Sequence, residues 1–215
     1  MAFISLKPGA MLAPVPAALI TCGAEERGTL RQNVMTAAWV GTVCTKPPMV
    51  SVSIRPSRYS LELIDRSGEF AVNLTDRALL RAADYCGVRS GREEDKFAAC
   101  GLTRAELPPL KYAPGIAESP VCLGCRVRGR QELGSHILFL GEIVYLGIRP
   151  DLMDEQGKVN LQKADLIAYS HGLYQSLSEP LGFFGFSVAA PEVLERRMAE
   201  IRDQIRDQTR DQARE

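Results

Sequence analysis

Short apolar runs, separated by polar residues and turn signals, follow one another along the chain as far as Ile148. Runs of this kind that are rich in small and β-branched residues are typical of strands. The alternation is clearest where Phe70, Val72 and Leu74 fall on one side of an extended backbone. The pattern predicts strands over Val15–Gly23, Val34–Thr45, Met49–Ile54, Glu69–Leu74, Val121–Arg130 and His136–Ile148.

Helical spacing of apolar residues is rarer and predicts two helices. The first covers Ser57–Ser67 and is ended by Gly68, and the second covers Asp76–Tyr85. Gly87–Pro109 is polar and predicts a loop with one short helical turn near Phe97. Because strands outnumber helices, we expect a mainly β fold: a mostly antiparallel, closed or nearly closed barrel with flanking helices.

The end of the chain has a different pattern, in which RDQ occurs three times between Arg202 and Gln212. Asp203 and Arg206 can meet on a helix, as can Asp207 and Arg210, and Pro191 suits a first helical turn. We therefore expect one domain over residues 1–190 and a charged helical tail over 191–215. Ile201, Ile205 and Thr209 form a narrow stripe, so the tail is either a solvated helix or a helix that packs on a second subunit.

Composition narrows the class of protein. The 26 basic and 26 acidic residues balance, which argues against nucleic acid as the partner. The chain has no apolar run of the length that a membrane helix needs. The apolar run Ala10–Ile20 contains two prolines and is interpreted as a first strand instead of a signal peptide. We therefore expect a cytoplasmic protein whose six cysteines are reduced.

Cys122-x-x-Cys125 is the one motif that suggests a metal or a redox pair. A zinc site needs two further ligands at suitable spacing, and residues three apart on a strand point to opposite faces. We expect no metal site here. The chain contains no HExxH, P-loop or GxGxxG motif that would indicate a zinc protease, P-loop chemistry or a Rossmann site.

Hydroxyl and guanidinium groups gather just before and within the start of the first predicted helix, at Ser53, Arg55, Ser57, Arg58 and Ser60. Arginine and serine are donors that suit a phosphate, and a helix N-terminus adds free N–H groups. The alternative is an ordinary serine N-cap beside solvated arginines.

An aromatic wall for a flat ligand lies a little earlier in the chain. Trp39 follows an Asn-x-Met-Thr segment, Asn33 to Thr36, which is expected to form a turn. A single tryptophan also occurs often in a core, and His136 taken alone would be a structural histidine. Together with the Ser/Arg cluster, this order suits a ligand with a flat ring at one end and a phosphate at the other.

The order of these elements resembles the flavin reductase-like family of FMN-binding, Greek-key-like split β-barrels, which includes the flavoredoxins. The resemblance covers roughly Pro14 to Val188. It implies that Ser60, after Tyr59, contacts the FMN phosphate with the cations of Arg55 and Arg58. It also implies that Lys96, in Gly-Arg-Glu-Glu-Asp-Lys-Phe, contacts the flavin; its alternative is a loop lysine in solvent.

The resemblance assigns the ring end in the same way. Residues near the flavin would be Asn33, Met35, Thr36 and Trp39, with Ser53 in the neighbouring Ser/Arg cluster. His136, which follows Gly134-Ser135, would lie at the flavin site, and Tyr169 would cover the ring. No side chain is needed as an acid or base for hydride transfer, although His136 is a candidate.

By resemblance, the expected function is an NAD(P)H-dependent oxidoreductase that passes electrons through FMN to free flavin, an iron complex, oxygen or a protein. NAD(P)H would be a transient reductant, and the protein would be a homodimer. A flavoredoxin-type electron carrier with tightly bound FMN and little NAD(P)H turnover is the alternative. A third reading is a split barrel that has lost flavin and binds haem or nothing.

Overall fold

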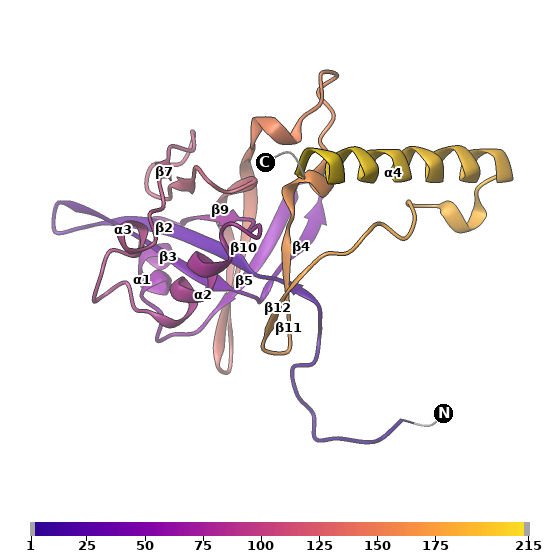
Figure 1. Cartoon of the computed structure of the whole chain (residues 1–215). Helices are drawn as coiled ribbons and strands as arrows, with labels where there is room; N and C mark the ends of the chain where they lie inside the picture. The colour runs from indigo at the N-terminus through magenta and orange to yellow at the C-terminus, as the bar shows by residue number, and fades with distance from the viewer. Residues whose placement is uncertain (1–2, 213–215) are drawn as a thin grey trace. The chain divides into compact units, whose positions relative to one another are not determined.

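The computed structural model describes the backbone of residues 3–212 and the side chains of residues 3–203. The chain divides into two compact units, Met1–Ser176 and Leu177–Glu215. The larger unit contains every strand found in residues 3–212 (Figure 1). No helix in the described part of the chain is long and apolar enough to cross a membrane.

A seven-stranded antiparallel sheet forms the larger unit and confirms the predicted mainly β fold. Its spatial order is β3-β2-β6-β9-β10-β5-β4. The strands are β2 (Ala18–Glu26), β3 (Thr29–Ala37), β4 (Val40–Thr45), β5 (Pro48–Ile54), β6 (Glu69–Asn73), β9 (Val121–Leu133) and β10 (His136–Ile148).

The prediction of one strand over Val34–Thr45 is wrong, because the chain bends at Ala38 and Trp39. The segment before the bend belongs to β3 and pairs with β2, whereas the segment after it is β4 and pairs with β5. β3 and β4 are the two edges of the sheet, yet only two residues join them. The sheet must therefore curl until its edges come close, which makes a nearly closed barrel with Trp39 at the seam.

The helices lie close to their predicted positions. Helix α1 (Tyr59–Ser67) ends at Gly68, whose φ of 67° is the left-handed cap expected of glycine. Helix α2 (Leu80–Val88) begins four residues later than predicted. Asp76 accounts for the delay, because its side chain accepts a hydrogen bond of 3.0 Å from the backbone N–H of Leu79.

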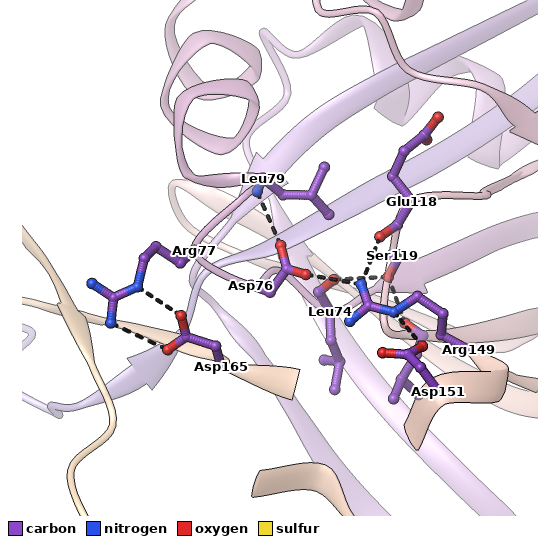
Figure 2. Close-up of polar contacts among 10 residues, drawn as sticks. Leu74, Asp76, Arg77, Leu79, Glu118, Ser119, Arg149, Asp151 and Asp165 are labelled. Atoms are coloured by element: carbon purple, nitrogen blue, oxygen red, sulfur yellow. Dashed lines mark hydrogen bonds and ion pairs between the residues drawn. The ribbon is translucent and has the colours of Figure 1, made fainter. Parts of the chain in front are cut away.

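A partly buried ion pair joins that turn to Arg149, the residue after β10. The other carboxylate oxygen of Asp76 accepts a 3.0 Å hydrogen bond from Arg149, which also binds Asp151 and the carbonyl of Glu118 (Figure 2). Asp76 is 5% exposed, whereas the Arg149 side chain is 31% exposed, so the pair is partly shielded from screening by solvent. The contacts hold the start of α2 in a fixed position beside the sheet.

The strand predicted over Val15–Gly23 is divided at Ala17, so that Val15–Pro16 form a separate strand, β1, ahead of β2. β1 forms a small sheet with two strands that were not predicted, β11 (Ile167–Ser170) and β12 (Leu173–Ser176). The pair of β7 (Arg104–Ala105) and β8 (Gly115–Ile116) was not predicted either. The helical turn expected near Phe97 is α3 (Lys96–Ala99), and 3-10 turns cover Pro150–Leu152 and Leu161–Ala164. The hairpin expected over Gly129–Ser135 is tighter, since only Gly134 and Ser135 separate β9 from β10.

Two apolar clusters fill the two sides of the sheet near the predicted site. The larger one joins strand residues such as Met35 and Val52 to Leu63 and Ile64 of α1. The second joins Leu19 and Val34 to residues of α2 and α3. Neighbouring residues of β3 therefore face different helices, as the alternation along a strand requires.

The smaller unit contains a 3-10 turn (Phe186–Val188) and helix α4 (Pro191–Gln212). Within it, the guanidinium of Arg197 lies 4.1 Å from the ring centre of Phe183, and Arg196 pairs with Glu200 at 3.8 Å. The backbone of the predicted tail helix is thus present. The predicted Asp203–Arg206 and Asp207–Arg210 pairs and the stripe beyond Ile201 involve side chains outside the described residues.

Candidate functional site

Asn33 and Ser60 meet in the interior of the larger unit. Asn33 is on β3 and 4% exposed, and Ser60 is in the first turn of α1 and fully buried. The Asn33 amide nitrogen donates a 2.8 Å hydrogen bond to the Ser60 hydroxyl. Two predicted site residues that are far apart in sequence are therefore brought together, and the bond fixes the start of α1 against β3.

Gly91 lies in close contact with the side chain of Asn33. A Cβ atom at position 91 would lie 2.0 Å from the side-chain oxygen of Asn33, a distance that non-bonded atoms do not adopt. Only glycine therefore allows the loop between α2 and α3 to cross Asn33 so closely. No local pattern in the sequence indicates this role of Gly91, because it depends on a contact between distant segments.

Lys96 lies in the same region and is only 3% exposed, so the interpretation as a loop lysine in solvent is wrong. Its ammonium donates hydrogen bonds to the carbonyls of Cys86 (3.0 Å) and Arg89 (3.2 Å). Among the described residues, no carboxylate lies within ion-pair distance of it. Burial lowers the pKa of Lys96, and the nearby guanidinium of Arg58 acts in the same direction.

Arg55 and Arg58 frame the turn that leads from β5 into α1. The backbone N–H of Arg58 bonds to the carbonyl of Arg55 at 3.0 Å, and Arg58 is the N-cap residue of α1. Arg55 is exposed and Arg58 is half-buried. In the described part of the chain neither guanidinium forms an ion pair, so both are available to an anion.

His136 lies next to Arg55 at the start of β10. The register pairs Ile137 with Ile54, the last residue of β5, which places His136 beside Arg55, the residue that follows β5. Burial lowers the pKa of His136, and the positive charge of Arg55 lowers it further. Both effects favour the neutral imidazole, whose Nδ1 shares a 2.9 Å hydrogen bond with the Ser135 hydroxyl.

Trp39 and Tyr169 line one cavity of about 200 Å³, and Ala10–Ala13, Val15, His171 and Gly172 complete its wall. Trp39 is 40% exposed, so it is not a core residue. The ring of Tyr169 packs edge-to-face on Tyr174, with centroids 5.5 Å apart. The carbonyl of Trp39 accepts a 2.9 Å hydrogen bond from the backbone of Ser53, which connects this cavity to the strand that leads to Arg55.

The Asn-x-Met-Thr segment is not a turn, because Asn33 to Thr36 lie in β3 with full pairing to β2. Their side chains alternate between faces. Met35 packs in the core with Asn33 on its side of the strand, whereas the Thr36 hydroxyl bonds to the carbonyl of Ala83 on α2. The structure therefore does not bring these three side chains together as one set.

Cys122 and Cys125 belong to different apolar clusters on the two sides of the sheet. Burial raises the pKa of each thiol to about 12. In the part of the chain that the structure describes, no group of three or more His, Cys, Asp or Glu side chains is arranged to hold a metal ion.

The arrangement thus has a cationic, hydrogen-bonding end around Arg58, Ser60 and Lys96 and an aromatic cavity at Trp39. Solved structures with a split-barrel domain share the fold, so the chain is a split-barrel protein. Residues 11–178 match the flavin reductase like domain, and the chain belongs to that family.

Three similar proteins illustrate the range of the family. The flavoredoxin of Desulfovibrio vulgaris (Miyazaki F) superposes with a TM-score of 0.77 at 31% identity, over 86% of this chain and 98% of that one. An uncharacterized Archaeoglobus fulgidus protein is 38% identical over 63% of this chain and 73% of its own length. The NADH-dependent FMN reductase AsuE2 of Streptomyces nodosus subsp. asukaensis is 27% identical over 79% of this chain and 82% of its own length.

Proposed function

We propose that this protein is an FMN-binding oxidoreductase that takes electrons from NAD(P)H and passes them to a small-molecule or protein acceptor. The observation that carries the proposal is the buried ammonium of Lys96. It has only carbonyl partners among the described residues and lies close to Arg58, which has no ion-pair partner there. Two neighbouring cations, neither of which forms an ion pair with a carboxylate among the described residues, suit a bound phosphate.

The residues fit the two ends of FMN in different ways. Arg55 and Arg58 would hold the phosphate, assisted by the N-terminus of α1. Ser60 is fully buried and its hydroxyl accepts a bond from Asn33, so its contribution is to position that turn. The ammonium of Lys96 would add positive electrostatic potential at the phosphate end of the site.

At the ring end, Trp39 and Tyr169 would provide the apolar wall, and backbone groups near Thr36 and Ser53 would meet the polar edge. The neutral imidazole of His136 would supply a hydrogen-bonding group beside Arg55. When bound, FMN supplies the redox chemistry, because its ring accepts hydride from a reduced nicotinamide and releases electrons singly or in pairs. The protein positions the ring and excludes water.

The similarity to AsuE2 supports NADH as the reductant. The similarity to a flavoredoxin favours a second candidate, an electron carrier with tightly bound FMN and little NAD(P)H turnover. Steady-state oxidation of NADH and NADPH, with and without added flavin, distinguishes the two. Rapid turnover supports the reductase, whereas tight FMN binding without turnover supports the carrier.

A homodimer in the cytoplasm is also part of the proposal. All six cysteines are free, which suits a reducing compartment. Trp39, Leu146 and Met153 are at least 40% exposed and would be covered in a dimer. Light scattering after size exclusion measures the mass directly, and a monomer at micromolar concentration would contradict this part.

A further inference from the structure

Two thiols face each other where α2 and α3 pack. The sulfur atoms of Cys86 and Cys100 are 3.9 Å apart, and both residues are free cysteines. Cys86 is buried in the apolar cluster beneath α2, whereas Cys100 is partly exposed and follows the last residue of α3. In the described part of the chain, this is the one contact that joins two thiols.

The geometry allows the two sulfur atoms to bond. A disulfide needs a sulfur separation of about 2.05 Å, so the gap must close by about 2 Å. Cys100 is at the end of a four-residue helix and is followed by Gly101, whose φ is 65°. A short element of this kind can supply the movement through one side-chain rotation and a small backbone shift.

The pair is coupled to the cationic end of the proposed flavin site. Cys86 offers its carbonyl to the ammonium of Lys96 at 3.0 Å and its thiol to Cys100. Lys96 is the first residue of α3 and Cys100 caps its end. A bond between the sulfur atoms would therefore fix α3, and Lys96 with it, against α2.

We propose that Cys86 and Cys100 are a redox-active dithiol that a low-molecular-weight disulfide converts into an intramolecular disulfide. The accessible Cys100, as its thiolate, attacks the external disulfide and releases one small thiol. The thiolate of Cys86 then attacks the Cys100 sulfur and displaces the second. The protein loses two electrons and two protons, which end on the two released thiols.

The rate of the second step follows from the environment of Cys86. Burial, and after it the neighbouring Cys100 thiol, raise the pKa of Cys86 to about 12. Few Cys86 side chains are thiolates at neutral pH, so the mixed disulfide at Cys100 should form first and resolve slowly. The effect of the bond on flavin affinity rests on the proposed function, whereas bond formation does not.

The full-length protein is incubated with oxidised glutathione as the probe. The remaining free thiols are then trapped by alkylation, and disulfide-linked peptides are identified by peptide mapping. We expect a linked peptide pair that contains Cys86 and Cys100 and that dithiothreitol abolishes. Cys44 is partly exposed, has no thiol partner and should stop at the mixed disulfide, so Cys44→Ser should leave the linked pair unchanged. Cys100→Ser should remove the linked pair while circular dichroism confirms that the variant folds.

Free thiols at both positions after prolonged oxidation, with Cys44 modified in the same sample, would overturn the proposal. A second readout is the FMN dissociation constant, which we expect to fall roughly threefold or more on oxidation because Lys96 is held in place. An unchanged constant would overturn the coupling to the site. If neither form binds FMN but the linked pair appears, the proposed function fails and the dithiol stands.

Discussion

Replacing Arg58 with glutamine should weaken FMN binding by roughly 10- to 150-fold. Arg58 is half-buried at the start of α1 and makes no ion pair among the described residues, so the substitution breaks no internal pair. A hydrogen bond to a charged group contributes about 1.5–3 kcal/mol, and each 1.4 kcal/mol is a factor of ten in affinity. The shorter amide side chain loses both the charge and the fork of donors.

The assay is a titration of flavin fluorescence with FMN and with riboflavin, which has the same ring without the phosphate. Arg58→Gln should reduce the affinity for FMN and leave the affinity for riboflavin within about twofold. Arg27→Gln, at the turn between β2 and β3, is the matched control and should change neither. Equal losses for the two ligands, or no loss for FMN, would refute the placement of the phosphate at Arg58.

Three further variants test the interior of the site. Ser60→Ala leaves the buried amide of Asn33 without its partner and should lower the free energy of unfolding by about 1–3 kcal/mol in urea denaturation. Gly91→Ala places a methyl group against the same side chain and should cost about 1–3 kcal/mol and weaken FMN binding. Arg55→Gln removes a cation beside His136 and should raise the pKa of that imidazole, as read from its NMR titration.

A control variant and the direction of a pH effect test these predictions. Gly41→Ala adds a methyl group where no atom lies within 4 Å, so it should leave both the free energy of unfolding and FMN binding unchanged. His136 has a lowered pKa in the folded state, so the unfolded chain binds its proton more strongly. Stability should therefore fall as pH drops below about 6.5, and Arg55→Gln should reduce that loss. A pKa that falls in the variant would contradict the assigned cause.

The strands of the barrel could be predicted because they are short apolar runs rich in small and β-branched residues, and β5 and the first half of β10 also bury alternate residues. Gly68 marked the end of α1, as its left-handed φ requires. The break at Trp39 was missed because Ala37, Ala38 and Val40 continue the composition of a strand across it. Only the pairing partners distinguish β3 from β4, and these are residues distant in sequence.

The candidate site could likewise be predicted only in part, because its contacts join residues that are distant in sequence. Local spacing located the Ser/Arg cluster, but it could not show that Ser60 points inward to Asn33. Lys96 was assigned to the site by resemblance, whereas its polar sequence context favoured a position in solvent. The two carbonyls that accept hydrogen bonds from its ammonium belong to Cys86, in α2, and to Arg89, the residue after α2. The need for glycine at position 91 follows from a tertiary contact that no local pattern contains.

The most direct test of the central claim is the visible spectrum of the protein after incubation with FMN and removal of unbound ligand, before and after anaerobic NADH or NADPH. We predict a retained flavin spectrum that bleaches with one of the two nucleotides. A spectrum that persists until dithionite is added would favour the electron carrier. A protein that retains no flavin and shows no saturable binding of FMN in titration would contradict the account.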